Sequence, residues 1–426
     1  MKSRHLLSGI AFAAIVAASS ASSASAAELR FACYQDGVEC DAWAEQFKAF
    51  EAENPGTTVA VDIVPYKSIV ESLPLQLASG EGPDLARVTD LGGLATYMLD
   101  VTPYVADAAK LEEQYGKTLA WTRVNGPDDK GIYAIMDQQT ATGPFVNKTL
   151  FEQAGVDMPG AGATYEEWAA AAKKVAEATQ TPYPMALDRS GHRYAGPAIS
   201  YGAKLFDDKG DPITVDEGFR AFSEQFVAWN EDGTIAKEVW AGAGGATYQD
   251  AAKEFTNGSL VMYMSGSWQI GRFGRDIGDA FDWVAVPAPC GPGGCTGIPG
   301  GAAIAAFKHT KAPEEVGKLL DFIAREDVQA KVLAKTKNIP ANQALQVKGI
   351  DYENATDAEK AALTAFGNAL AGFSPVAFQF QGYKNNRAIM NATVTRITQA
   401  IVGELSLDEA LDRIDADVEE AVAAAQ

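Results

Sequence analysis

The chain has 426 residues, which is enough for about two domains that each bury a core of their own. Hydrophobic residues make up 47% and charged residues 21% of it, as in an ordinary folded globular protein, so the composition does not indicate disorder. The formal net charge of −21 argues against nucleic acid and anionic membrane surfaces as partners, because both attract basic patches.

The first 27 residues predict a secretory signal peptide. Lys2 and Arg4 give a basic start, Leu6 to Val16 form a short apolar run, and Ala24-Ser25-Ala26 is an A-x-A cleavage site. Cleavage there removes two of the 35 Lys and Arg residues and none of the 56 Asp and Glu residues, which leaves a net charge of about −23. No second long apolar segment follows, so we expect no transmembrane helix and a protein of the periplasm.

The four cysteines form two close pairs, Cys33 with Cys40 and Cys290 with Cys295. In an oxidising compartment such pairs indicate local disulfides, with free buried thiols as the alternative. A zinc site would need tighter spacing, and we expect neither a metal site nor a cofactor. Residues 30–32 read Arg-Phe-Ala, unlike the small and aliphatic run before a lipid-anchored cysteine, so we expect no lipoprotein.

The period of the apolar residues alternates between strand and helix in the first part of the chain. It predicts a strand at Leu29 to Cys33, a helix capped by Asp41 with Trp43, Phe47 and Phe50 inward, a strand at Val59 to Ile63, a helix at 68–78 that ends at Gly80, and a strand at 84–88. This order is typical of a mostly parallel sheet with helices on its faces.

The same alternation resumes further on. It predicts a capping box at Thr164 and Glu167, an apolar strand at Leu260 to Met264, a helix with Pro313 in its first turn, and a C-terminal helix opened by a second capping box at Ser406 and Glu409. Two lobes are expected, although no shift in composition marks a boundary between them.

Seven segments, in order, resemble motifs of the maltose-binding-like extracellular solute-binding proteins of sugar ABC transporters. They are Gly80-Glu81-Gly82-Pro83-Asp84-Leu85 (G-x-G-P-D), Gly131 to Ile135, Phe145 to Phe151 with Ala154-Gly155 after it, Phe255 to Met262, Gly266-Ser267-Trp268, Gly300-Gly301, and Asn338 to Ala341. Each motif alone is weak, but the match spans nearly the whole chain after the signal.

The resemblance implies an α/β, two-lobed periplasmic-binding-protein fold of the class II type. Each lobe would be a mostly parallel sheet flanked by helices, residues 28–138 with 302–343 forming one and residues 142–298 with 349–426 the other. Crossover strands would form the hinge, and closure around the ligand would give the shape that a permease recognises. The implied function is that of a monomeric ABC import component, not an enzyme, that captures a mono- or oligosaccharide in the cleft.

Aromatic and polar side chains together make sugar sites, because rings stack on the sugar while polar groups satisfy its hydroxyls. Trp268 matches a family position that stacks on sugar, with core packing as the alternative. Tyr383 matches another aromatic position, although the neighbouring Phe378 and Phe380 are equally able to pack there.

The polar candidates follow predicted strands or lie at the implied crossovers. Tyr34, Gln35 and Asp36 follow the first strand in a loop that a Cys33–Cys40 bridge would preorganise, unless that loop is purely structural. Asp90 follows the third strand, where the family often places a carboxylate against sugar hydroxyls. The crossovers add Gln138 and its neighbour Gln139, and Gly300 and Gly301, which would let the backbone reach the ligand.

One basic cluster suggests a variant of this function. Arg189, His192 and Arg193 lie in a segment where related proteins place an aromatic contact. Together with Arg87 and Arg387 they could bind a carboxylate, sulfonate or phosphate of an anionic sugar derivative. The alternatives are hydrogen bonds to a neutral sugar or pairing with Asp188 at the surface.

Other function classes stay open at this point. The same fold class includes binders of glycerol phosphates, polyamines and metal ions, although only three histidines, His5, His192 and His309, argue against a metal. A secreted glycoside hydrolase or lyase would need two positioned carboxylates, and no acidic segment matches a hydrolase motif. A structural or adhesive protein would not be stabilised by any small molecule.

Overall fold

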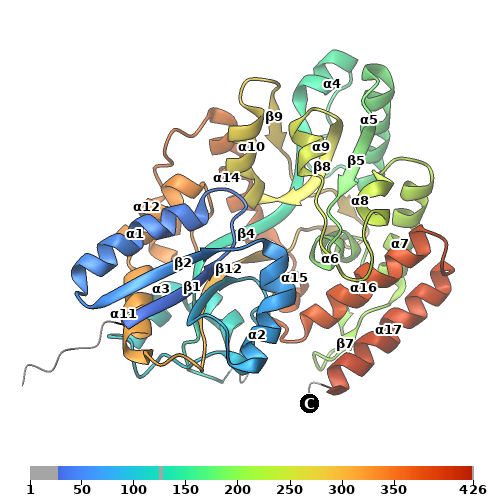
Figure 1. The fold of residues 1–426 in the computed structure, drawn as a ribbon. Coiled ribbons are helices and arrows are strands. Elements are labelled where there is room, and N and C mark those ends of the chain that lie inside the picture. Colours follow the sequence, from blue (N-terminus) through green and yellow to red (C-terminus); the bar gives the residue numbers. More distant parts are fainter. Residues whose placement is uncertain (1–26, 124–127, 425–426) are drawn as a thin grey trace, which may run out of the picture.

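A computed structural model describes residues 27–123 and 128–424 of the chain. Two hydrophobic cores divide these residues into two lobes (Figure 1). The N-terminal core draws on residues 29–136, 302–332 and 341, and the C-terminal core on residues 141–298, 339 and 362–418. The predicted signal peptide lies outside the described residues, apart from Ala27, which opens the first strand.

The N-terminal lobe begins with the predicted order of strands and helices. Its elements are β1 (Ala27–Cys33), α1 (Glu39–Glu53), β2 (Thr57–Ile63), a π-helical turn (Ser68–Ser72), α2 (Leu73–Ser79), β3 (Leu85–Val88), α3 (Ala108–Leu119), two 3₁₀ turns (Ala95–Tyr97 and Ala120–Thr122), β12 (Pro299–Ala306), α11 (Pro313–Ala324) and α12 (Glu326–Thr336). β1 pairs in parallel with β2 and β3. Trp43, Phe47 and Phe50 of α1 are buried as predicted.

The start of α1 corrects one prediction. The helix begins at Glu39 with Val38 at the N-cap and no side-chain cap, so the assignment of Asp41 as the cap was wrong. The Glu39 carboxylate instead accepts the backbone N–H groups of Asp36 and Gly37, which lie in the loop before the helix. The helix therefore begins earlier, next to the disulfide at Cys40.

The C-terminal lobe is larger and more helical. Its elements are α4 (Lys148–Ala154), α5 (Tyr165–Thr179), β5 (Tyr183–Leu187), α6 (Gly191–Ser200), β6 (Leu205–Phe206), β7 (Pro212–Ile213), α7 (Glu217–Glu231), α8 (Lys237–Ala241), α9 (Ala252–Thr256), β8 (Leu260–Gly266), a 3₁₀ turn (Ser267–Gln269), α10 (Ile270–Ile277), β9 (Trp283–Ala285), β10 (Cys290–Gly291), β11 (Gly294–Cys295), α14 (Asp357–Gly372), α15 (Pro375–Gly382), α16 (Asn386–Ile401) and α17 (Leu407–Ala424). The capping box at Thr164 and Glu167 is present, and Ser406 and Glu409 cap each other at α17.

The strand β4 (Ala134–Asn147) joins the two lobes in one sheet (Figure 1). Its first half pairs antiparallel with β12, and its second half pairs antiparallel with β8 and β9. The strand order is therefore β2-β1-β3-β12-β4-β8-β5, with parallel pairs at both ends and antiparallel crossover strands in the middle. The segment before α13 (Gln343–Lys348) crosses beside β4, where the Gln139 N–H donates to the Ile339 carbonyl.

No single helix of the described residues is long and apolar enough to cross a membrane. The pair α14 and α15 meets the length and composition criteria only when taken together, across a bend of 94°. Its side chains Leu363, Phe366 and Phe380 are buried in the C-terminal core.

Candidate functional site

A cavity of about 90 Å³ lies between the lobes. Its lining combines aromatic rings, amides, hydroxyls and two arginines from both lobes and from the crossover strands. The lining residues are Tyr34, Asp36, Tyr66, Thr89, Gln138, Thr140, Ser190, His192, Arg193, Tyr248, Trp268, Gly300, Gly301, Gln381, Asn386, Arg387 and Met390.

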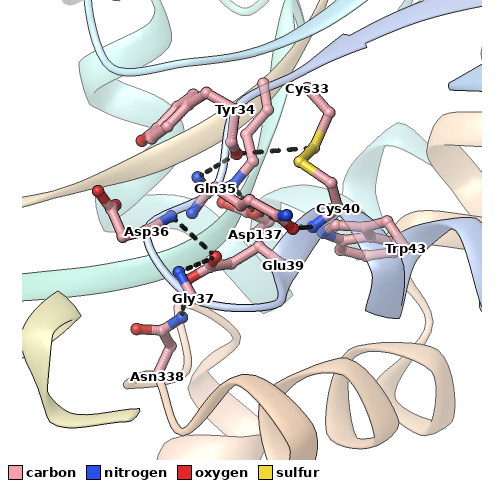
Figure 2. The surroundings of a disulfide bond; sticks show 11 residues. Cys33, Tyr34, Gln35, Asp36, Gly37, Glu39, Cys40, Trp43, Asp137 and Asn338 are labelled. Carbon is pink, nitrogen blue, oxygen red and sulfur yellow. Dashed lines mark hydrogen bonds and ion pairs between the residues drawn. A yellow bond between two sulfur atoms is a disulfide. The ribbon is translucent and has the colours of Figure 1, made fainter. Parts of the chain in front are cut away.

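The loop after β1 supplies two of these residues, and the predicted Cys33–Cys40 disulfide spans it (Figure 2). The Glu39 carboxylate accepts the N–H groups of Asp36 and Gly37 at 3.1 and 2.9 Å. Gln35 accepts the N–H of Cys40 at 3.2 Å, so its side chain fastens the loop and does not line the cavity. A cross-link and local hydrogen bonds thus hold Tyr34 and Asp36 in place.

The Asp36 carboxyl group points away from the hydrogen bonds that hold its loop (Figure 2). It lines the cavity, and no hydrogen bond within the described residues satisfies it. Burial, followed by the nearby Glu39 carboxylate, raises the pKa of Asp36 to about 7. Above about pH 7 the group is a carboxylate that is available to accept hydrogen bonds from a bound molecule.

Arg87 lies behind Tyr34 and does not line the cavity. Its Nε donates to Asp137 Oδ2 at 2.7 Å, its Nη1 donates to the Tyr34 carbonyl at 3.1 Å, and its guanidinium lies 4.4 Å from the centre of the Tyr34 ring. Trp43 Nε1 also donates to Asp137 Oδ2. Both charged groups are almost fully buried, so Arg87 positions Tyr34 and ties it to the start of the hinge strand.

The second lobe places Arg193 against the cavity. Its guanidinium lies 4.0 Å from the ring of Trp268 and 5.5 Å from the ring of Tyr248. Asp188 Oδ2 lies 3.6 Å from Arg193 Nε, and the Asp188 carboxylate accepts hydroxyl hydrogen bonds from Tyr263 and Ser265. Burial raises the pKa of Asp188 to about 6, while Arg193 opposes that shift.

His192 is neutral in this site. Burial and then the adjacent Arg193 lower its pKa to about 3. Its Nε2 lies 3.3 Å from the Pro299 carbonyl and its Nδ1 lies 3.4 Å from Arg193 Nη1. Because the carbonyl can only accept and the guanidinium can only donate, the proton is on Nε2.

The crossover strands form the floor of the cavity. Gln138 and Thr140 of β4 line it beside Gly300 and Gly301 of β12. A Cβ at Gly300 would lie 2.9 Å from Thr140 Oγ1 and 3.3 Å from His192 Nε2, and a Cβ at Gly301 would lie 2.3 Å from the Gln138 carbonyl. Gly300 thus keeps the floor free beside Thr140 and His192, whereas Gly301 lets β12 lie close to the backbone of β4.

The lobes touch on more than one side of the cavity, so the structure is closed. Arg387 of α16 donates to Asp90 Oδ2 at 3.3 Å across the lobes. Trp121 stacks on Phe378 with ring centres 6.3 Å apart. Tyr66 and Tyr248 also meet across the lobes, edge to face, with ring centres 5.7 Å apart.

Nine of the predicted ligand-binding residues line the cavity and four do not. The nine are Tyr34, Asp36, Gln138, His192, Arg193, Trp268, Gly300, Gly301 and Arg387. Gln35 and Arg87 support the first loop, Asp90 pairs with Arg387, and Tyr383 packs on Phe206 in the C-terminal lobe. Arg189 is fully buried and binds the backbone carbonyls of Trp240 and Gly245, so it braces the loop that carries Tyr248.

Eight further lining residues were not among the predicted ligand-binding residues. They are Tyr66, Thr89, Thr140, Ser190, Tyr248, Gln381, Asn386 and Met390. Tyr66 follows β2, so its place at the end of a parallel strand was a usable signal. Tyr248 lies in a glycine-rich loop whose path is decided by the Arg189 hydrogen bonds, and no local pattern indicates its position.

Two lobes, a continuous crossover sheet and a closed polar cavity between them define a two-lobed solute-binding protein. The chain belongs to the family of bacterial extracellular solute-binding proteins, whose profile matches residues 37–330. The family resemblance found in the sequence is thereby confirmed, and so are both predicted disulfides.

Curated relatives and solved structures of similar extent support this assignment. A binding protein of Brucella abortus is 25% identical over 366 residues, which covers 84% of this chain and 85% of the relative. The multiple sugar-binding protein of Streptococcus mutans is 24% identical over 294 residues, which covers 65% of this chain and 66% of the relative. An ABC substrate-binding protein of Listeria monocytogenes in complex with cycloalternan matches with a TM-score of 0.78 at 18% identity, covering 93% of this chain and 99% of that structure. Maltose-bound MalE3 of T. maritima matches with a TM-score of 0.76 at 19% identity, covering 92% of this chain and 99% of that structure.

Proposed function

We propose that this protein is the periplasmic solute-binding component of an ABC import system, that it captures a carbohydrate between its lobes and that it delivers the ligand to a membrane permease. The observation that carries the proposal is the cavity lining. Gln138, Gln381, Thr140 and Ser190 supply amide and hydroxyl groups, and Asp36 supplies an acceptor. Such a mixture of donors and acceptors beside aromatic rings suits a ligand rich in hydroxyl groups. The named ligands of the similar proteins, maltose and cycloalternan, are carbohydrates.

The charges of the site favour a neutral carbohydrate over an anionic derivative. Arg193 faces Asp188 and Arg387 faces Asp90, so each cavity arginine already has a carboxylate partner. Asp36 adds a further carboxylate to the lining. An anionic ligand would therefore meet no excess of positive charge.

The same lining supports binding without turnover. Asp36 is the single carboxylate that lines the cavity within the described part of the chain, whereas most glycoside hydrolases place two carboxyl groups about the scissile bond. We propose accordingly that the protein is not an enzyme. We also propose that it acts as a monomer, that residues 1–27 are removed on export without lipid attachment, and that the lobes comprise residues 28–138 with 302–343 and 142–298 with 349–426.

Thermal unfolding of the chain from residue 28 onward, with a panel of sugars, polyols and sugar acids, tests the proposal. A ligand at 100 times its Kd should stabilise the folded protein by about 2.7 kcal/mol, which gives a clear rise in Tm. Recovery of the bound sugar unchanged after long incubation would support binding without turnover. If no carbohydrate raises Tm while a sugar-free solute does, the carbohydrate assignment is wrong.

A further inference from the structure

Two tyrosines from opposite lobes close one side of the cavity. The rings of Tyr66 and Tyr248 meet at 82° with centres 5.7 Å apart. The Tyr66 hydroxyl lies 2.9 Å from Thr89 Oγ1, and the Tyr248 hydroxyl donates to Asp188 at 3.3 Å. Each ring is therefore held by a partner in its own lobe, and the two rings meet only when the lobes close.

A second hollow of about 390 Å³ shares these two tyrosines with the cavity. Its other walls include Glu71 and Asn391, which do not line the cavity. Ser190, Arg193, Arg387 and Met390 also line both spaces, so the tyrosine pair forms one part of the boundary between the small cavity and the larger hollow beside it. A chain of sugar rings that ran from one space into the other would cross this boundary, where the rings of Tyr66 and Tyr248 meet across the lobes.

The aromatic surface inside the cavity is also limited. Trp268 is 8% exposed, and the Arg193 guanidinium lies 4.0 Å from its ring centre. Asp188 Oδ2 lies 3.6 Å from the Nε of that guanidinium. The face of Trp268 that Arg193 covers is not free to stack a further sugar ring, as the sites for longer oligosaccharides would require.

The cavity is small beside the second hollow. Its volume of about 90 Å³ is less than a quarter of the 390 Å³ of the second hollow. A space needs about 10–15 Å³ of this kind of volume to hold one water, so the cavity has room for more than one water but is small. Such a size favours a compact ligand over a chain of sugar rings.

Building on the proposed carbohydrate function, we propose that the closed site takes a single sugar ring or a linear polyol of the same size, and that Tyr66 and Tyr248 set this limit. A disaccharide can bind only if the pair stays apart, so it would forgo the contacts that closure forms. The closed form, and with it high affinity, belongs to ligands of one sugar unit.

Calorimetric titration of the wild-type protein tests the size limit. The panel pairs single units (D-glucose, D-galactose, D-mannose, D-fructose, D-xylose, D-mannitol and D-sorbitol) with longer sugars (maltose, sucrose, trehalose and maltotriose). We expect the tightest single unit to bind at least 100-fold more tightly than any longer sugar. A longer sugar that binds more tightly than every single unit would overturn the size limit and leave the carbohydrate function intact. Failure of the whole panel to bind, with binding of a sugar-free solute instead, would overturn the carbohydrate function itself.

Substitutions of the two tyrosines test whether the pair sets the size limit. Tyr248→Ala should reduce the ratio of the affinity for the tightest single unit to the affinity for the tightest longer sugar at least tenfold. Tyr248→Phe keeps the ring and should leave this ratio unchanged. Trp121→Ala is the matched control, because it removes a different ring contact between the lobes, with Phe378, and does not line the cavity. If Trp121→Ala narrows the preference as much as Tyr248→Ala does, the pair does not set the limit. If Tyr248→Ala does not fold, Tyr66→Ala answers the same question from the other lobe.

Discussion

The Asp36→Asn substitution should raise the free energy of unfolding at pH 8 and lower the affinity for the ligand. The folded protein holds the pKa of Asp36 at about 7, against 3.8 for the group in its ordinary state, because the carboxyl group is buried and lies near Glu39. The native state therefore binds more protons than the unfolded chain between about pH 4 and pH 7. Stability contributed by this group is fully present below about pH 4 and is lost as the pH rises to about 7.

The magnitude follows from the difference in pKa. About three pKa units at about 1.4 kcal/mol each give a loss of up to about 4 kcal/mol above pH 7, and less where water reaches the carboxylate in the open form. The asparagine side chain cannot ionise, so the variant without ligand should be more stable than the wild type at pH 8 and not at pH 4. If the carboxylate accepts a ligand hydroxyl, the affinity should fall about 10- to 100-fold, as for a charge-assisted hydrogen bond of about 1.5–3 kcal/mol.

Urea unfolding of both proteins at pH 4, 6 and 8 measures the first effect, and calorimetric titration at pH 8 measures the second. Asp41→Asn is the matched control, because it removes an exposed negative charge from the same segment without touching the cavity. A difference in unfolding free energy between Asp36→Asn and the wild type that does not change from pH 4 to pH 8 would contradict the raised pKa of Asp36.

Two further substitutions test the closed form and the buried support of the site. A Cβ at Gly92 would lie 2.2 Å from the Lys384 carbonyl in the other lobe. Gly92→Ala should therefore lower the ligand affinity at least tenfold and change the free energy of unfolding by no more than about 0.5 kcal/mol. Calorimetry against Gly160→Ala, where nothing lies within 4 Å, checks this, and equal affinities would contradict it. Arg87→Met should lower the unfolding free energy by about 3–5 kcal/mol, because it leaves the Asp137 carboxylate buried without its cation. Urea unfolding measures this, and a loss under about 1 kcal/mol would contradict it.

Interactions between residues near in sequence were the predictable part of the fold. The capping box at Thr164 and the bridge from Cys33 to Cys40 each depend on a few neighbouring residues, and both are present. The alternation of apolar and polar residues likewise predicted the strand β2, although Ile63 at its end is 52% exposed. Local geometry and local burial determine such features, so the sequence alone indicates them.

Contacts between the lobes were not predictable in the same way. Tyr66 and Tyr248 meet only because the crossover strands set how the lobes face each other. Trp268 was expected either to stack on the ligand or to pack in the core. It lines the cavity and is only 8% exposed, because its ring lies over Gly266, where a Cβ would be 2.0 Å from the ring, and because Arg193 covers it. The sequence pattern placed these residues near the site, but tertiary packing decided what each one touches.

The shared strand β4 has a consequence for how the protein can be observed. Because its 14 residues are hydrogen-bonded first into one lobe and then into the other, the lobes can bend or twist about this strand but cannot slide apart. Opening is then a rotation of one lobe relative to the other about the crossover strands. A single pair of fluorescent labels, one near Leu75 on α2 and one on α17, would convert occupancy of the site into one distance. A change in the distance between the two labels would then report binding of the ligand.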